Sequence, residues 1–557
     1  MKHDLEVGIQ TAIKELFDTD VVVALTRPDE QFGDYATNIA LQLAGKLDAK
    51  PREIADSLAV KIREDLAEFV SDVSVDGPGF LNLKLSNEAL LKAAANEPAK
   101  TLTGQVIVAE YSDPNPFKVL HAGHLYTSVV GDAIANLLEH AGATVHRVNF
   151  GGDVGLHVAK NMWAMLKTLG GENPEKLSAV PEGERADWLS ERYVEGNEAY
   201  ESDEAAKREI IELNARIYGL HDKNDHESPF AQIYWTTRTW SYDYFNAFYA
   251  RIGSKFEKYY SESETAPIGL KTVKVHLGKV YEESQGAIIF DGEKYGLHTR
   301  VFINSQGLPT YEAKDVGLIM AKERDYHFDR SVVITGNDIV EYMKVVLKSI
   351  EQFAPKLAVA TTHLTHGIVK LQGGEKMSSR KGNILRAVDV LDAAAVANKA
   401  ATGNEDEQVT LGAVKYAFLK QRIGGDTLYD PKESVSLEGN SGPYLQYAHA
   451  RARSILRKAA QQAMPILFNY ALNASERSLV SKLTEYPEVV DKAVAELMPH
   501  HICTYLFELT QIFNRFYEQN RVLGEEQEIP RISLVGNYVA TLQKGLSLLG
   551  IAAPEQM

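Results

Sequence analysis

The chain contains a single cysteine, Cys503, among its 557 residues. One thiol excludes intrachain disulfides and any zinc site built from several thiolates. No apolar run reaches the ~18 residues needed to cross a bilayer, and residues 1–20 lack the apolar segment that follows the basic start of a signal peptide. These absences predict a cytoplasmic protein with no membrane partner, no protein-bound zinc and no other metal site.

Two common nucleotide-binding motifs are also missing. There is no GxGxxG after the first strand of the predicted parallel sheet, and no GxxxxGK[ST] in the chain. The sequence therefore argues against a dinucleotide-binding enzyme and against a P-loop protein.

The formal net charge of −17 argues at first against a nucleic-acid partner. Binding depends on local patches, however, while net charge mainly sets solubility and steering. Two stretches, 410–425 and 440–460, contain no acidic residue. Either they form ordinary solvated helix faces, or they contact a phosphate-rich partner. Their basic side chains are Lys415, Lys420, Arg422, Arg451, Arg453, Arg457 and Lys458.

The first of three predicted domains is an α+β module over residues 1–100. Apolar periodicity predicts helices over 5–17, 35–47 and 51–69. Two strand-like runs follow, 70–75 and 80–85, and a Gly-Pro-Gly turn at 77–79 joins them.

A Rossmann-like catalytic domain is predicted over residues 101–390. A strand over 106–109, a helix over 124–141 and a strand over 144–149 make a βαβ unit, which implies a parallel sheet. Further strands are expected at 332–335 and 366–371. The polar, aromatic-rich stretch at about 167–288 is predicted as an insertion in this domain. Residues 391–557 show amphipathic helices and no convincing strand, which predicts an all-α C-terminal domain.

The first chemical motif is His121-Ala122-Gly123-His124, at the start of a predicted helix. Imidazoles can donate to phosphate oxygens, a glycine allows close approach of a nucleotide, and a helix N-terminus favours anions. Alone, this short motif is equally compatible with a structural role.

The second motif, residues 376–383 with the sequence KMSSRKGN, lies about 250 residues later in the chain. Its cations, hydroxyls and glycine suit a loop that clamps a triphosphate, although a basic surface loop could have the same composition. Together and in this order, the two motifs resemble the HIGH and KMSKS hallmarks of class I aminoacyl-tRNA synthetases.

Within that class the resemblance is closest to the arginyl-tRNA synthetases, and it covers nearly the whole chain. It is carried by residues 110–121 (EYSDPNPFKVLH), 443–451 (PYLQYAHAR), 33–38 (GDYATN) and 79–82 (GFLN). The resemblance implies an enzyme that forms arginyl-adenylate from ATP and L-arginine and then charges tRNA(Arg). It also implies an N-terminal domain that touches the tRNA elbow and a helical domain that reads the anticodon stem-loop.

The resemblance assigns roles to individual residues. His121, His124, Lys376 and Lys118 are expected to be catalytic, and Glu110, Asn115, Tyr311 and Asp315 are expected to bind arginine, with Asn115 on its α-amino group. ATP, with Mg²⁺ as part of the substrate complex, is expected to contact Gly123, Gly336, Asp338, Met377, Ser378, Ser379 and Lys381. For tRNA the candidates are Tyr444, Gln446, Arg451, Tyr35 and Asn38.

Arginine is also a physically reasonable substrate for this residue set. A guanidinium is planar and always charged, so a selective pocket needs at least two carboxylates. Tyr311 and Asp315 are spaced i, i+4 and would share one helix face. Lysine could not satisfy both carboxylates at once, and buried unpaired groups can discriminate by roughly 10⁴–10⁵ without an editing site.

The chain departs from the family pattern at four positions. Ile339 replaces a glutamine that helps bind the substrate amino group, Val154 and His157 stand where tryptophan and glutamine are common, and Tyr126 replaces an arginine. These changes put individual contacts in doubt while the phosphate-handling positions are retained.

Two alternatives remain at this stage. A cysteinyl-tRNA synthetase would need a cysteine-bound zinc, which Cys503 alone cannot provide. A synthetase-like protein that binds tRNA without catalysis would not need the intact histidine and lysine motifs. A monomer is expected from the resemblance.

Overall fold

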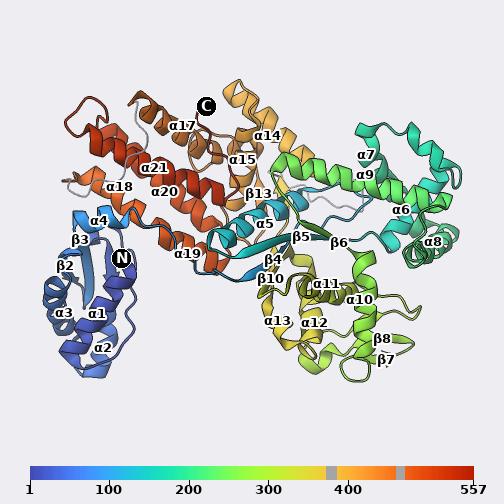
Figure 1. Ribbon diagram of the computed structural model, residues 1–557, viewed down its shortest axis with the longest axis horizontal. Coiled ribbons are helices and arrows are strands. Elements are labelled where there is room, and N and C mark those ends of the chain that lie inside the picture. Colours follow the sequence, from blue (N-terminus) through green and yellow to red (C-terminus); the bar gives the residue numbers. More distant parts are fainter. Residues whose placement is uncertain (372–384, 460–470) are drawn as a thin grey trace.

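The N-terminal module is a small antiparallel sheet covered by helices, and in the computed structural model it projects from the molecule beside α18 (Ala474–Thr484) and α19 (Tyr486–Glu496) of the helical domain (Figure 1). The structure describes residues 1–371, 385–459 and 471–557. The sheet order is β1-β3-β2. The elements are α1 (Lys2–Phe17), β1 (Tyr35–Thr37), α2 (Ile39–Leu47), α3 (Pro51–Asp65), β2 (Val70–Asp76), β3 (Phe80–Leu85) and α4 (Asn87–Ala93).

One prediction for this module was wrong. The helix expected over 35–47 begins only at Ile39, because residues 35–37 form β1 and pair with β3. The alternate residues Tyr35 and Thr37 are buried, which gives this short run the period of a strand. The other predicted helices and strands of the module are present.

A five-stranded parallel sheet forms the core of the central domain, in the order β11-β10-β4-β5-β6. β4 lies in the middle, and its apolar run of Val and Ile is typical of a strand buried on both faces. The chain leaves β4 toward β5 and β6, and later returns to add β10 and β11 on the other side. Ligands bind where strand order reverses in this way, at the carboxyl ends of the strands. The sheet strands are β4 (Val106–Glu110), β5 (Thr144–Gly151), β6 (Lys258–Ser261), β10 (Arg330–Gly336) and β11 (Thr361–His366).

The stretch predicted as one insertion is interrupted by the sheet itself. β6 lies within 167–288 in the sequence but pairs with β5 as the edge strand. The inserted material therefore consists of a helical group before β6 and a small antiparallel sheet after α10, and these two groups lie on the right in Figure 1. Besides the sheet strands, the central domain contains the following elements, in chain order: α5 (Ala122–His140), α6 (Leu156–Leu169), α7 (Arg185–Ser202), α8 (Glu204–Lys223), α9 (Pro229–Ile252), α10 (Glu262–Val275), β7 (Glu282–Ser284), β8 (Ala287–Phe290), β9 (Arg300–Ile303), α11 (Tyr311–Tyr326), α12 (Val340–Glu351) and α13 (Pro355–Ala360).

The described residues of 391–557 are mainly helical, as predicted, and contain one short strand. This strand, β13 (Thr427–Tyr429), pairs in parallel with β12 (Val369–Leu371), whereas no strand was expected within 391–557. Because β13 has only three residues, it leaves no periodic signal in the sequence. The elements are β12 (Val369–Leu371), α14 (Ala387–Thr402), α15 (Glu407–Leu419), β13 (Thr427–Tyr429), α16 (Pro431–Ser434), α17 (Gly442–Lys458), α18 (Ala474–Thr484), α19 (Tyr486–Glu496), α20 (His500–Gln519) and α21 (Glu528–Leu548).

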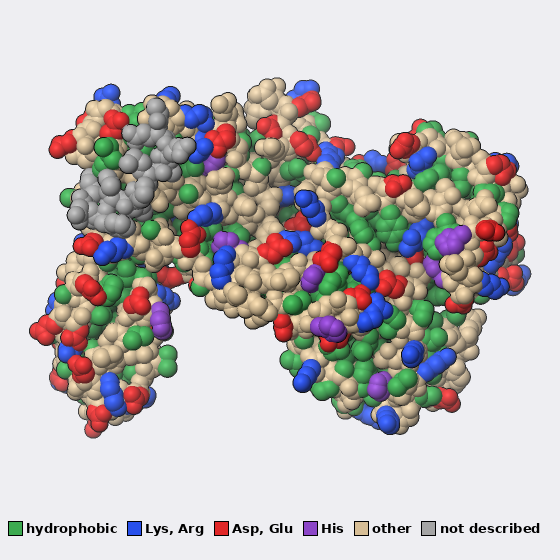
Figure 2. Space-filling view, viewed as in Figure 1, with side chains coloured by type: hydrophobic (Ala, Val, Ile, Leu, Met, Phe, Trp, Pro, Cys, Tyr) green, Lys and Arg blue, Asp and Glu red, His purple; other side chains and the backbone are tan. Residues whose placement is uncertain are grey.

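Charged side chains of both signs are interspersed over the face shown in Figure 2. The described acidic residues therefore form no single large acidic patch on this face. Among the described residues, no helix is both long enough and apolar enough to span a membrane.

Candidate active site

The two histidines of the HAGH motif are held together at the start of α5. His121 caps the helix, and its Nδ1 accepts a hydrogen bond from the Gly123 amide at 3.1 Å. His124 Nδ1 accepts from the His121 amide at 3.1 Å, and the two rings stack with centroids 3.7 Å apart. A Cβ on Gly123 would lie 2.9 Å from the His121 ring, so the motif requires glycine there.

These contacts define the protonation state of both imidazoles. Each Nδ1 is an acceptor, so the proton of a neutral ring sits on Nε2. Burial, with the nearby Lys118 charge adding to it, lowers the pKa of His121 to about 4. Burial and His121 likewise lower the pKa of His124 well below its usual value. At neutral pH the pair therefore presents two uncharged Nε2–H donors at a helix N-terminus.

Gly336 is the last residue of β10, and Asp338 lies in the short turn that follows this strand. Asp338 is exposed, and its charge raises the pKa of both His121 and His366, against the larger effect of burial. His366 ends β11 and its Nε2 lies 2.7 Å from the Thr127 hydroxyl of α5. The structure thus brings the predicted nucleotide residues Gly123, Gly336 and Asp338 to the same edge of the sheet and adds His366, which lay in a stretch predicted only as strand-like.

The predicted lysine loop can be located only through its flanks. Lys376, Met377, Ser378, Ser379 and Lys381 lie outside the described residues. The chain resumes at Leu385, whose carbonyl accepts from the Ala122 amide at 2.8 Å, and the Ala387 amide donates to the Leu120 carbonyl at 2.8 Å. The segment after the loop is therefore fixed directly beside the HAGH motif.

Lys118 lies between the nucleotide motif and the inserted helices. Its Nζ is 4.0 Å from the centre of the Tyr193 ring of α7. Burial and the nearby Lys160 lower its pKa to about 8, while Glu262 acts in the opposite direction. Lys118 is therefore mainly charged at neutral pH, and a phosphate-bearing ligand beside it would raise its pKa again.

The strand that precedes the motif ends in Glu110, which is only 3% exposed. Its Oε2 accepts from Lys322 Nζ of α11, which also donates to Ser331 Oγ at 3.0 Å. Because Lys322 is fully buried and compensates its charge, the predicted direct role of Glu110 in guanidinium binding is limited to its other oxygen.

A second buried ion pair lies in the same region. Glu262 begins α10 directly after β6, and its Oε2 is 2.5 Å from Lys314 Nζ of α11. Both side chains are 5% exposed. Sequence reasoning missed this pair, since Glu262 lay within the predicted insertion; the strand-like run KYYS before it was the available signal.

Asp315 lies on α11 between these two pairs. The Tyr342 hydroxyl donates to its Oδ2, and in the part of the chain that the structure describes Asp315 has no basic partner. Burial raises the pKa of Asp315 to about 7, and the Glu110 and Glu262 charges act in the same direction. Tyr311, four residues earlier, is 59% exposed. Asp315 is half-buried, and a carboxylate in this electrostatic state favours binding of a cation.

Asn115 is anchored to the end of β5. Its Oδ1 accepts from the Gly152 amide at 2.7 Å, so the side chain presents its Nδ2 donors outward. The Oδ1 keeps a second lone pair, so the α-amino contact expected for Asn115 stays a prediction.

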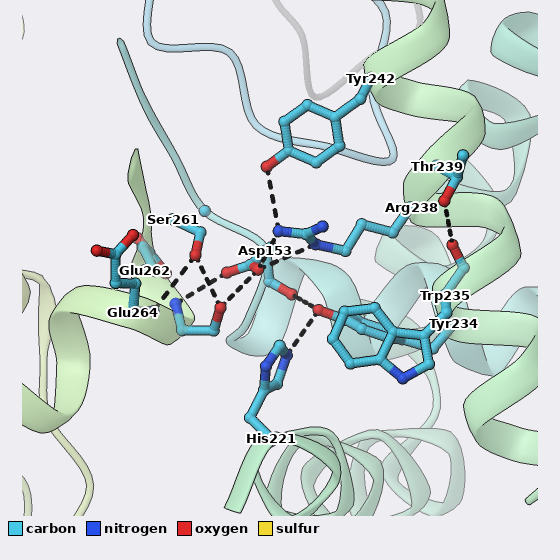
Figure 3. Close-up of polar contacts among 12 residues, drawn as sticks. Asp153, His221, Tyr234, Trp235, Arg238, Thr239, Tyr242, Ser261, Glu262 and Glu264 are labelled. Atoms are coloured by element: carbon cyan, nitrogen blue, oxygen red, sulfur yellow. Dashed lines mark hydrogen bonds and ion pairs between the residues drawn. The ribbon is translucent and has the colours of Figure 1, made fainter. Parts of the chain in front are cut away.

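Asp153, in the loop that follows β5, joins the inserted helices to the sheet (Figure 3). It is fully buried and accepts from the Ser263 amide at 2.9 Å and the Ser263 hydroxyl at 2.7 Å. Arg238 of α9 donates to it from Nε at 3.1 Å, and the Tyr234 hydroxyl donates to its backbone carbonyl at 2.8 Å. This network fixes the start of α10, and with it the position of Glu262.

Three of the four departures from the family pattern are packed into the fold. Val154 is fully buried, and His157 Nε2 donates to the Gly152 carbonyl at 2.7 Å. Tyr126 is 1% exposed, with its ring 4.8 Å from that of His366. Ile339 is half-buried in the turn before α12 and offers no hydrogen-bond acceptor from its side chain.

Two of the predicted tRNA contacts fall on buried side chains. Tyr35 is 1% exposed and donates to Glu488 of α19 at 2.6 Å, so it joins the N-terminal module to the helical domain. Gln446 is fully buried and donates to the Gln408 and Ala552 carbonyls at 3.1 and 2.9 Å. Their burial and hydrogen bonds give both a structural role, and a direct contact with tRNA stays a prediction.

The other three candidates lie at or near the surface. Arg451 is exposed with its guanidinium 4.7 Å from the Tyr517 ring centre. Tyr444 is half-buried and its hydroxyl accepts from Asn514 at 2.9 Å. Asn38 is exposed at the rim of a cavity of about 380 Å³ on the N-terminal module. This cavity is also lined by Thr26, Phe32, Thr37, Phe80 and Asn82.

No group of three or more His, Cys, Asp or Glu side chains within 1–371, 385–459 and 471–557 is arranged to hold a metal ion. The expected absence of protein-bound zinc stays a prediction.

Comparison with known proteins covers the whole chain. Residues 3–85 match the arginyl tRNA synthetase N terminal domain, residues 86–428 the catalytic domain of class I (R) tRNA synthetases, and residues 445–557 the DALR anticodon binding domain. An arginine–tRNA ligase from Porphyromonas gingivalis is 30% identical over 603 residues, with 99% of each chain covered.

Solved structures show the same architecture. The arginyl-tRNA synthetase of Thermus thermophilus is similar with a TM-score of 0.80 and 26% identity, covering 100% of both chains. The arginyl-tRNA synthetase of Plasmodium falciparum has a TM-score of 0.79 at 21% identity, with 100% of this chain and 99% of that chain covered, which shows the shared fold.

Proposed function

The chain belongs to the arginyl-tRNA synthetase family, and from this premise we propose how its own residues charge tRNA(Arg) with arginine. L-Arginine attacks the α-phosphate of ATP to give arginyl-adenylate and pyrophosphate, and the 3′-terminal adenosine of the tRNA then accepts the arginyl group. The observation that carries the proposal is the pair of neutral Nε2–H donors of His121 and His124, next to a buried acidic pocket.

In the activation step the two histidines donate to phosphate oxygens as negative charge moves onto the leaving pyrophosphate. Neutral donors need no proton exchange, so their hydrogen bonds can strengthen without a change of protonation state. Lys118 supplies a positive charge on the same side. Mg²⁺ enters with ATP as part of the substrate, and the KMSSR residues Lys376 and Ser378 are proposed to hold the leaving group.

The guanidinium is proposed to bind at Asp315, with the Tyr311 ring beside it and the second oxygen of Glu110 within the same pocket. The Lys314 and Lys322 pairs neutralise Glu262 and most of the Glu110 charge, so Asp315 supplies the main uncompensated charge at this end. A lysine substrate would leave part of this planar acceptor set unpaired.

For tRNA we propose contacts at both ends of the molecule. Arg451 and Tyr444 on α17 lie in the helical domain that matches the anticodon binding family, and Asn38 lies at the cavity of the N-terminal module. Exposed Phe32 and Phe80 at that cavity provide apolar surface on which an unpaired base can stack. We further propose that the enzyme acts as a monomer in the cytoplasm.

The test is ATP–pyrophosphate exchange with each of the twenty amino acids, with and without total tRNA. We expect exchange with arginine, and we expect it to depend on tRNA. Binding of tRNA without exchange for any amino acid would refute the enzymatic function and support the inert tRNA-binding alternative.

A further inference from the structure

The loop between β4 and α5 has an unusual backbone at its start. Ser112 and Asp113 have φ values of 76° and 48°, in the left-handed region that residues other than glycine rarely adopt. Asp tolerates this conformation better than most residues because its short side chain can bond locally. The two residues turn the chain from the end of β4 back toward β5.

This turn places the Asp113 side chain on the end of β5. Its Oδ1 accepts from the Phe150 amide at 2.8 Å, and Asn115 Oδ1 accepts from the Gly152 amide, two residues further along. The two side chains are therefore anchored side by side, with Asp113 roughly 6–7 Å closer to the middle of the sheet than Asn115. One Asp113 oxygen is fixed, and the other is left to accept a further donor.

The surrounding charges leave Asp113 uncompensated. Lys322 is paired with Glu110, Lys314 with Glu262, and Arg238 with Asp153. Within the described residues, neither Asp113 nor Asp315 has a basic partner, and unlike Asp132, whose two oxygens accept from the Tyr111 and Ser254 hydroxyls, Asp113 has an oxygen that accepts no hydrogen bond. Burial and the Glu110 charge also raise the pKa of Asp113 well above its usual value. A half-buried carboxylate without a basic partner favours a cationic ligand.

L-Arginine carries two cationic groups, the guanidinium and the α-ammonium. Asp315 accounts for the first. For the second, Asn115 offers only a neutral carbonyl oxygen that already accepts from the Gly152 amide, and the Ile339 side chain has no polar atom. Asp113 precedes Asn115 in the loop that leads to the HAGH motif. That order matches a substrate whose guanidinium lies deep in the pocket and whose carboxylate lies near the nucleotide.

We propose that Asp113 binds the α-ammonium group of the arginine substrate through its free carboxylate oxygen. This assignment rests on the proposed function, and it gives the chain an anionic acceptor that Asn115 and Ile339 do not provide. Asp113 is a binding residue that holds the amino acid with its carboxylate toward ATP.

Two analogues of arginine test the assignment. Agmatine keeps the guanidinium and the amine but lacks the carboxylate, whereas 5-guanidinopentanoate keeps the guanidinium and the carboxylate but lacks the amine. Both are measured as competitive inhibitors of arginine in ATP–pyrophosphate exchange with tRNA present. The variant is Asp113→Asn, which retains an oxygen for the Phe150 amide, and the matched control is Glu257→Gln, an exposed carboxylate outside the site.

In Asp113→Asn we expect the KM for arginine and the inhibition constant of agmatine to rise roughly 10- to 100-fold, as for loss of a charged hydrogen bond. The inhibition constant of 5-guanidinopentanoate and the KM for ATP should change less than about twofold on the same basis, and Glu257→Gln should match the wild type throughout. Equal weakening of both analogues would overturn the assignment, because Asp113 would then bind the guanidinium or support the fold. Unchanged agmatine inhibition would also overturn it. Absence of exchange in the wild type would instead refute the proposed function.

Discussion

The protonation of Asp315 provides a quantitative test of the arginine pocket. Burial raises its pKa to about 7, and the Glu110 and Glu262 charges add to this, while the Tyr342 hydroxyl and Lys322 oppose it. A guanidinium binds the ionised carboxylate, which is the minor form below pH 7 and the major form above it. Arginine affinity should therefore rise as the pH increases through this range.

The expected size follows from the fraction of Asp315 that is ionised. With a pKa of about 7 this fraction is about one in eleven at pH 6 and about ten in eleven at pH 8, and the apparent Kd scales with its inverse. The Kd for arginine should fall about tenfold between these pH values, with a proton released near pH 7. His121 and His157 have pKa values lowered to about 4 and about 3, so both stay neutral across the window. Burial and the Glu110 charge raise the pKa of Asp113 as well, so its ionisation acts in the same direction and makes tenfold the smallest fall expected.

Isothermal titration calorimetry of arginine at pH 6, 7 and 8, in buffers of different ionisation enthalpy and with saturating tRNA, measures both the Kd and the released proton. Tyr342→Phe is the matched variant, because it removes a hydroxyl that stabilises the charged form of Asp315. Its midpoint should move to higher pH. A wild-type Kd that is the same at pH 6 and pH 8 would refute the reasoning, as would a Tyr342→Phe midpoint that moves downward.

Three further predictions concern charge pairs and the domain contact. Lys322→Met leaves Glu110 buried and unpaired and should lower the free energy of unfolding by about 3–5 kcal/mol. Adding Glu110→Gln to this variant should restore part of that free energy. If thermal unfolding shows that the two substitutions destabilise the protein additively, the pairing is contradicted. Lys118 has a pKa of about 8 and loses its charge above that pH, so the KM for ATP in exchange assays should rise between pH 7 and pH 9. In Lys118→Arg the KM for ATP should stay constant over this range, because arginine keeps its charge. A KM for ATP that is equally constant in the wild type would contradict the assignment. Glu488→Gln weakens the 2.7 Å ion pair with Arg27 that joins the N-terminal module to the helical domain. The KM for tRNA should rise by up to about fivefold, as for a pair worth up to about 1 kcal/mol, while the KM values for arginine and ATP stay unchanged. A parallel rise in all three KM values would show that the contact acts on the whole fold.

Long periodic elements were predicted well from the sequence. The buried strand at 106–109 and the helix after it were found because apolar runs and a 3.6-residue period extend over many residues. Short elements were missed for the converse reason. β1 and β13 have three residues each, and β6 has four, so none of them shows a period long enough to separate strand from helix or loop.

The nucleotide side of the site was predictable because its residues are close in sequence. His121, Gly123 and His124 form one helix cap, so a local pattern fixes their mutual geometry. Gly336 and Asp338 follow a strand of the same sheet, and parallel topology brings their loop to the same edge.

The amino-acid side was less predictable because its chemistry depends on charge compensation between distant residues. Glu110 and Lys322 are 212 residues apart, and Glu262 and Lys314 are 52 apart. A carboxylate that lies beside a motif resembles a substrate ligand in the sequence whether or not a lysine neutralises it in the fold.

The same compensation explains the basic stretches at 410–425 and 440–460. Lys415 donates to the Gly550 carbonyl at 2.7 Å, Lys420 lies 3.2 Å from Glu433, and Arg453 lies 2.6 Å from Glu555. Much of the positive charge that seemed available for a phosphate-rich partner is therefore engaged within the helical domain. Arg422, Arg451 and Lys458 differ, because they are exposed and none of them forms an ion pair among the described residues. Of the three, Arg451 also lies over the Tyr517 ring. Uncompensated charge, and not the density of charged residues in the sequence, thus leaves these three as tRNA candidates, with Arg451 placed beside an aromatic ring, by the same reasoning that selects Asp113 and Asp315 for arginine.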